Sequence, residues 1–341
     1  MKTAVLAACV ACLVHARIAD GQSITAEAAV TAGYSTDDPA VGAQLRVFGD
    51  VKGGIRFFGE IASGKRFESE EGPQRSLEDS FGAAYPYTES VQIIEAYAER
   101  IFRPRGALLG IRGGRFRTPF GIYSASDHAY SGFLRAPLIR YDGYAALSNN
   151  YLEHGADLVG GIPRLTVEAA LGRPADVGTV DHRRRSDLDT VVRVQGYYGP
   201  FIVGASHIRT SPYQSLLLAP GRTDFTGIDL RWMYSGVQLR GEWMTGRPFD
   251  GTTTTGWYAD VLLHRRRMGP VTAVARVEKL EHTGAGEDPD LDLGRQTVGA
   301  RVRLTDALSL NVNVAHQRSA DGADYRPNVF DVGLTWSVRS R

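Results

Sequence analysis

The chain has 341 residues, of which 39 are Lys or Arg and 38 are Asp or Glu, and 43% are hydrophobic. The balanced charge argues against a nucleic-acid partner, and the length exceeds one ordinary soluble core, so a soluble protein of this size would be expected to have two domains. Glycine and the aromatic residues are instead spread from end to end, which indicates one repetitive structure.

Residues 1–21 have the pattern of a secretory signal peptide. Lys2 precedes an apolar run from Ala4 to Val14, and small residues follow. The run is too short to cross a bilayer. We predict cleavage after Gly21, with Val14-His-Ala16 as the alternative cleavage site.

Both cysteines, Cys9 and Cys12, lie within this signal. Leu6-Ala-Ala-Cys9 also has the form of a lipoprotein-processing sequence, which leaves lipidation as an alternative. The predicted mature chain, 22–341, has no cysteine, 37 basic and 37 acidic residues, because Lys2, Arg17 and Asp20 are removed.

Beyond the signal, apolar and polar residues alternate with a period of two, which is typical of half-buried strands. Val237-Gln-Leu-Arg-Gly-Glu-Trp243 places Gln238, Arg240 and Glu242 on one face, and Leu308-Ser-Leu-Asn-Val-Asn-Val314 does the same with Ser309, Asn311 and Asn313. About sixteen such segments are predicted: 23–34, 41–50, 54–64, 91–103, 106–117, 151–161, 164–172, 188–198, 200–209, 224–234, 236–246, 256–266, 270–280, 295–304, 307–317 and 328–338.

The connections between these segments alternate between short turns and longer loops. Short turns include Lys52-Gly53, Gly199-Pro200 and Ser235-Gly236, and the longer loops include 65–90 and 118–150. An even strand number with short periplasmic turns and long external loops is characteristic of bacterial outer-membrane barrels. We therefore predict an all-β fold, a transmembrane antiparallel β-barrel of about 16 strands in an up-and-down meander, in the outer membrane of a Gram-negative-type bacterium. A secreted β-sandwich or propeller is the alternative, but no blade-length repeat is visible.

A barrel of this size leaves an aqueous channel. One face of the segments (Val, Leu, Ala, Gly and Trp) suits lipid, and the other (Arg, Glu, Gln, Asn and Asp) suits water. The sequence thus predicts a porin through which small hydrophilic solutes diffuse passively, with outer-membrane lipid as its surroundings.

The long loop 118–150 is expected to fold into the pore, because it is unusually long and rich in aromatic residues. Charged side chains in it and in the preceding strand would then narrow the channel and favour anions. The candidate pore-lining residues are Arg115, Arg117, Arg135, Arg140, Asp127 and Asp142. The alternative is that these arginines form ion pairs with wall carboxylates such as Glu95, Glu99, Asp157 and Glu168.

The usual patterns of catalytic and metal sites are missing from the sequence. A chain without cysteine has no thiol chemistry, and the histidines show neither HxH nor HxxxH spacing. We therefore expect no enzymatic activity, no cofactor and no metal. A barrel hydrolase with Ser and His on neighbouring strands, and a structural or adhesive barrel that binds a partner through its long loops, are the alternatives.

Gly113-Gly-Arg-Phe-Arg-Thr-Pro-Phe-Gly121, which follows the charged strand Ile94-Glu-Ala-Tyr-Ala-Glu-Arg100, resembles the phosphate-selective porin O and P family. The resemblance covers about 90–172. It implies a sixteen-stranded channel, commonly a homotrimer, that passes small anions or other solutes. Arg115 and Arg117 correspond to the basic positions of the family's motif.

Overall fold

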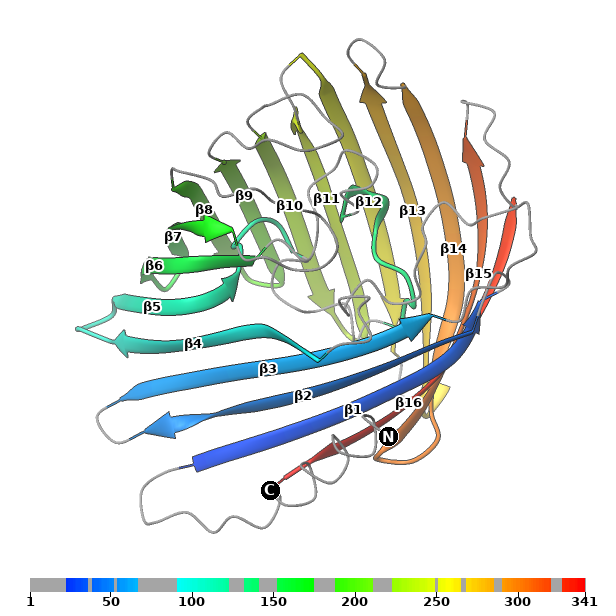
Figure 1. Ribbon diagram of the computed structural model, residues 1–341, viewed down its shortest axis with the longest axis horizontal. Helices are drawn as coiled ribbons and strands as arrows, with labels where there is room; N and C mark the ends of the chain where they lie inside the picture. The colour runs from blue at the N-terminus through cyan, green and yellow to red at the C-terminus, as the bar shows by residue number, and fades with distance from the viewer. Residues whose placement is uncertain are drawn as a thin grey trace.

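Sixteen antiparallel strands close into one barrel, in which β1 lies beside β16 (Figure 1). The computed structural model describes residues 23–35, 39–51, 54–66, 91–122, 132–140, 152–174, 188–210, 223–248, 251–264, 268–284, 290–319 and 327–340. The predicted signal peptide lies outside these residues and stays a prediction. In the described part of the chain, no helix is long and apolar enough to cross a membrane.

Each strand pairs with the strands that precede and follow it in the chain, so the barrel is an up-and-down meander, as predicted. The strands are β1 (Ser23–Ser35), β2 (Pro39–Val51), β3 (Ile55–Arg66), β4 (Gln92–Phe102), β5 (Leu108–Arg117), β6 (Leu152–Ile162), β7 (Leu165–Pro174), β8 (Asp189–Tyr198), β9 (Phe201–Arg209), β10 (Asp224–Tyr234), β11 (Val237–Arg247), β12 (Thr253–Leu263), β13 (Val271–Thr283), β14 (Leu291–Arg303), β15 (Leu308–Ser319) and β16 (Asn328–Arg339). A short 3₁₀ helix, η3 (Leu138–Arg140), lies in the segment between β5 and β6.

Closure depends on the pairing of the first and last strands. Val30 of β1 lies opposite Trp336 of β16, and the pairing continues through Gly33 and Gly333. A closed barrel has no strand edge with unpaired backbone groups, which a bilayer could not solvate.

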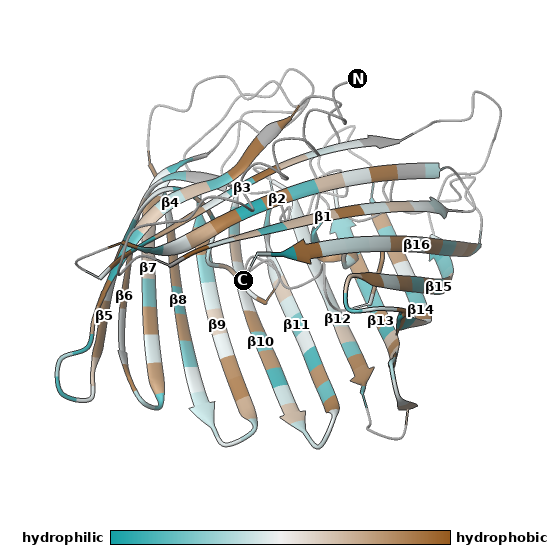
Figure 2. Ribbon diagram, turned by 90° about the horizontal axis from the view of Figure 1, so that it is seen from below, coloured by the Kyte–Doolittle hydropathy of each residue, from teal (hydrophilic) through white to brown (hydrophobic). Residues whose placement is uncertain are grey.

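Hydrophilic and hydrophobic residues alternate along many of the strands (Figure 2), and successive side chains of a strand point to opposite faces. In β11, Leu239 and Trp243 are exposed on the outer wall, whereas Arg240 and Glu242 are buried within the barrel. Other outward side chains are more exposed still, with Ile228 at 54% and Val298 at 60%. An apolar outer surface of this kind suits contact with lipid.

The strands of the C-terminal half extend further towards the long loops than the sequence predicts. β12 begins at Thr253 and not at 256, and β14 begins at Leu291 and not at 295. The β-branched run Thr253–Thr255 and the alternation of Leu291, Asp292 and Leu293 carry the strands beyond the predicted ends, because both patterns favour a pleated, half-buried strand.

Candidate functional site

The chain turns into the barrel after β5. Residues 116–122 and 132–140 are buried, and their ribbon lies within the ring of strands (Figure 1). We call these two described stretches the inner segment. The remainder of the predicted loop 118–150 lies outside the described residues.

Apolar contacts hold the inner segment against the wall. Five of its side chains share one hydrophobic cluster with inward-facing side chains from eight consecutive strands, β7–β14. The inner-segment members are Phe116, Phe120, Ile122, Leu138 and Ile139, and the wall members are Ala170, Val191, Ile208, Phe225, Met244, Tyr258, Leu280 and Leu293. One side of the barrel interior is therefore a dry core, because the removal of so much apolar surface from water is favourable.

Side chains of the wall also bind the backbone of the inner segment. The Leu138 N–H donates to Glu278 at 2.6 Å, and the Leu134 N–H donates to Asn313 at 2.8 Å. Asn313 in turn donates to the carbonyl of Gly132. These bonds satisfy backbone groups of an irregular segment that would be costly to bury unpaired.

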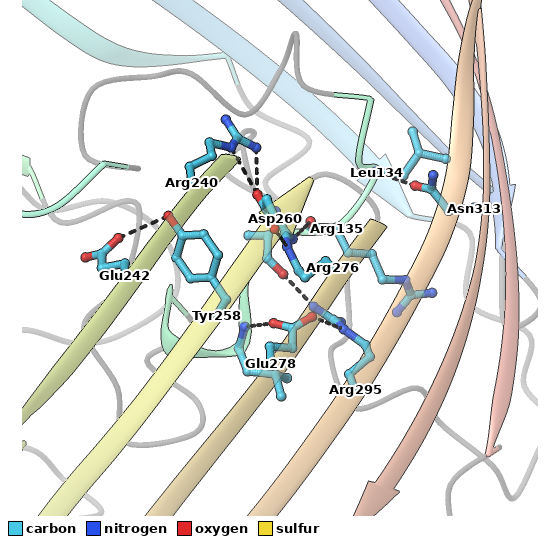
Figure 3. A network of polar contacts seen from close by, with 12 residues as sticks. Leu134, Arg135, Arg240, Glu242, Tyr258, Asp260, Arg276, Glu278, Arg295 and Asn313 are labelled. Carbon is cyan, nitrogen blue, oxygen red and sulfur yellow. Dashed lines mark hydrogen bonds and ion pairs between the residues drawn. The ribbon is translucent and has the colours of Figure 1, made fainter. Parts of the chain in front are cut away.

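A network of buried charges crosses the same wall (Figure 3). Asp260 accepts from both Arg240 and Arg276, and Glu278 accepts from Arg295 at 2.7 Å. Arg276 and Arg295 also donate to the carbonyls of Arg135 and Ala136. The inner segment is thus fixed to β13 and β14 by hydrogen bonds with charged groups, which are stronger than neutral ones.

Arg135 and Arg140, two of the predicted site residues, lie in the second stretch of the inner segment, 132–140, and form ion pairs. Arg135 binds Asp331 of β16 through two nitrogens, at 2.7 and 2.9 Å. Arg140 binds Glu242 of β11 and donates to the Phe120 carbonyl. Their charges are therefore compensated by wall carboxylates.

Arg117, another predicted site residue, lies at the end of β5 and is also buried. Its guanidinium is 3.4 Å from Glu60 and 3.7 Å from Glu95. Arg115 is half-buried and donates to the carbonyl of Ile94. The structure therefore places the two guanidiniums in different surroundings, although their spacing in the sequence suggests a shared face.

The remaining predicted site residues, Asp127 and Asp142, lie outside the described residues. Their role in the channel stays a prediction.

Sequence reasoning missed Arg112, which lies at the centre of a charged group on the inner wall. Its guanidinium lies within 4 Å of Glu99, Asp157 and Glu168, and 4.8 Å from the ring centre of Tyr97. Arg112 lies opposite the buried Asp157 of β6 and faces the lumen, whereas Arg115 has the parity of Leu109 and Ile111, which are exposed on the outer wall. The apolar residues Leu109 and Ile111 occupy the alternate positions of the strand, and this alternation is the sequence signal that could have identified Arg112 as luminal.

A cavity remains between the inner segment and β3–β10. It has a volume of about 270 Å³. Four arginines and two glutamates line it, together with a glutamine, two aromatic residues and part of the inner segment: Arg112, Arg117, Arg193, Arg231, Glu95, Glu168, Gln195, Phe58, Tyr97, Pro119, Gly121 and Ile122.

The arginines on the β8–β10 side of the cavity differ in their partners. Arg193 binds Asp229 at 2.9 Å and is buried. Arg231 is half-buried, and no carboxylate of the described residues lies within ion-pair distance of it. With its amide oxygen towards the two guanidiniums, Gln195 accepts from Arg193 and Arg231, each at 3.0 Å. Arg231 is thus a cation that faces the cavity with no compensating carboxylate among the described residues.

Aromatic rings cover the wall next to this cavity. Phe58 and Tyr97 are cross-strand neighbours whose ring centres are 5.3 Å apart, and Phe48 continues the row at 6.4 Å from Phe58. The rings support the Arg112 guanidinium, which lies over Tyr97.

The described residues hold no group of three or more His, Cys, Asp or Glu side chains that could bind a metal ion. Four histidines form hydrogen bonds with Thr or Asn: His207 with Thr226, His264 with Thr272, His282 with Thr254 and His316 with Asn328. The site therefore consists of fixed charges, amide groups and aromatic rings.

No protein-family model and no curated protein matches the chain. Several solved structures are similar to the chain. A loop L8 deletion mutant of OmpT, an outer membrane protein of Vibrio cholerae, has a TM-score of 0.62 at 10% identity, covering 93% of this chain and 99% of that one. The anion-selective porin from Comamonas acidovorans has a TM-score of 0.59 at 12% identity, covering 93% of this chain and 99% of that one. Salmonella typhi OmpF in complex with daunomycin has a TM-score of 0.61 at 12% identity, covering 93% of this chain and 97% of that one.

These similarities show the fold. The chain is a closed sixteen-stranded barrel of the outer-membrane type, as the sequence predicts. Together with its exposed apolar outer wall, this fold places the chain in the outer membrane of a Gram-negative-type bacterium.

Proposed function

We propose that the barrel is a porin, through which small hydrophilic solutes diffuse passively and anions pass more readily than cations. The carrying observation is the polar cavity beside the inner segment, with four arginines against two glutamates in its lining. Sixteen-stranded barrels leave an aqueous channel, and an excess of arginine at its narrow part favours anions. A fixed field of this kind requires no cofactor and no catalytic step.

Within this proposal, Arg231 is the residue that contacts the passing anion, because the other arginines of the lining bind carboxylates. Its planar fork can bind two oxygens of one phosphate or carboxylate. The resemblance of 113–121 to the phosphate-selective porin O and P family agrees with a preference for such oxyanions. Arg117, Arg135 and Arg140, which pair with wall carboxylates, fix the geometry of the constriction beside the inner segment in this scheme.

Conductance across a planar bilayer tests the proposal directly. Purified folded protein should give stepwise currents, and a tenfold KCl gradient should give a reversal potential of the sign for chloride preference. The permeabilities of phosphate and chloride can then be compared at equal charge concentration. Absence of steps from protein with an intact barrel would contradict the porin function and favour a structural or adhesive barrel.

We also propose that the barrel carries no hydrolytic activity and assembles as a homotrimer. Chromogenic ester and peptide substrates should stay uncleaved by the folded protein.

The Vibrio cholerae OmpT is described in a trimer form, and the same assembly here would appear as three subunits in native mass spectrometry. A monomer in mild detergent would overturn the trimer.

A further inference from the structure

The outer wall carries a notch at the long-loop end of β12–β15. Its volume is about 240 Å³. The outward side chains around it are Trp257, Val277, Lys279, Gln296, His316 and Arg318, with Gly294 at its base. This surface is separate from the lumen, and the proposed channel function does not use it.

The notch lies beside a pair of outer-wall tryptophans. Trp243 and Trp257 are cross-strand neighbours on the outer wall, and the same register row continues through Lys279, Gly294 and Arg318. Aromatic girdles mark the interface between hydrocarbon and head groups. Trp257, Lys279 and Arg318 each lie within five residues of the long-loop end of their strand, where the head groups of that leaflet are expected.

Gly294 creates the space, and Arg318 lies over it. A Cβ at Gly294 would be 2.8 Å from the Arg318 Nε, so any side chain there would displace the guanidinium. Lys279 contacts the carboxylates of Glu281 and Asp292 in the row nearer the loops. Arg318 is exposed, and no carboxylate of the described residues lies within ion-pair distance of it.

Nearer the middle of the outer wall, the surface around the notch becomes apolar. Val277, Val298, Val314 and Phe330 are all exposed there. Acyl chains can lie along these residues while a head group at the end of the chains reaches Arg318. An arginine on the lipid face is costly away from the interface, whereas its fork binds phosphate oxygens in pairs.

We propose that this notch binds the phosphate of a lipid head group in the leaflet on the long-loop side. Arg318 binds the phosphate, His316 and Gln296 border it, and Trp257 covers the adjacent glycerol or sugar region. The carboxylates of Glu281 and Asp292 remain bound to Lys279. Basic pockets on membrane proteins recognise head groups by the same chemistry.

Native mass spectrometry of the full-length barrel in detergent tests this site, with dioleoyl phosphatidic acid as the probe and dioleoylglycerol, which has no phosphate, as its comparison. The phosphate lipid should bind more tightly. Arg318→Gln should weaken its binding by roughly 10-fold or more, the value of one charge-assisted hydrogen bond. Gly294→Leu, which fills the notch, should do the same.

Arg100→Gln is the matched control, because Arg100 is exposed on the outer wall at the short-turn end and lies over Phe102. Binding should be unchanged in this variant. Equal binding of the two lipids, or equal losses in Arg318→Gln and Arg100→Gln, would overturn the proposal. Displacement of the lipid by millimolar inorganic phosphate would instead assign the notch to a soluble anion and overturn the lipid as occupant.

Discussion

Arg135 and Asp331 form a two-point ion pair across the barrel, Nε to Oδ2 at 2.7 Å and Nη2 to Oδ1 at 2.9 Å, although 196 residues separate them in the chain. The pair joins the inner segment to β16, the strand that closes the barrel against β1. The ion pair therefore couples the position of the inner segment to the closure of the barrel.

Asp331→Asn should lower the free energy of unfolding by about 3 kcal/mol, because removal of one partner from a buried ion pair leaves the other charge uncompensated. Urea titration in detergent micelles measures this value. The control is Asp50→Asn. Asp50 lies 3.7 Å from Arg56 in an exposed ion pair, in which the Arg56 side chain is 50% and the Asp50 side chain 64% exposed. That change should cost less than about 1 kcal/mol. Equal costs at the two sites would show that the Arg135–Asp331 pair does not stabilise the barrel.

Gly121→Ala should destabilise the inner segment by more than backbone strain alone. Gly121 has φ +62°, and a Cβ there would overlap the Glu242 carboxylate and the Arg140 guanidinium. Gly199→Ala is the matched control, since Gly199 has φ +57° with no atom within 4 Å of a Cβ. The control should lose about 1–2 kcal/mol of unfolding free energy from the left-handed backbone conformation, and Gly121→Ala should lose more. Similar losses would mean that the Arg140–Glu242 contact adapts to the extra atom.

Arg231→Gln should reduce the preference of the channel for anions. The attraction between one fixed cation and an anion in contact with it in water is about 1 kcal/mol. Its loss should therefore change the ratio of anion to cation permeability by about fivefold or less. The reversal potential in a salt gradient reports this ratio. Arg303→Gln, at an exposed residue on the short-turn end of β14, should leave it nearly unchanged. A wild-type ratio in Arg231→Gln would remove Arg231 from the permeation path.

Arg115→Gln and Arg117→Gln separate the sequence-based assignment from the structural one. If both arginines form the filter, each substitution should lower anion preference in the same bilayer measurement. The structure adds that Arg117→Gln should also cost about 3 kcal/mol of stability, because Glu60 and Glu95 lose a buried cation. Arg115→Gln should cost less, since Arg115 is only half-buried. Unchanged selectivity in both variants would exclude them from the filter.

The barrel itself could be read from the sequence, because lipid outside and water inside impose a period of two on every strand. Leu239, Arg240 and Glu242 are oriented as that period predicts. Strand ends do not follow from the period alone: the extra residues of β12 and β14 continue a strand-like pattern, and their pairing with β13 shows that they belong to the sheet. Hydrophobic pattern specifies which face a residue occupies, and only hydrogen bonding to the neighbouring strand decides where pairing stops.

The arrangement of the site was decided by tertiary structure alone. Arg135 and Arg140 were identifiable as charged residues of a long loop, but their partners Asp331 and Glu242 are far away in the chain. Arg231 resembles any other inward-facing arginine in the sequence. Whether such a charge is compensated depends on which strands the closed barrel brings opposite one another, and therefore on distances across the lumen that no local pattern contains.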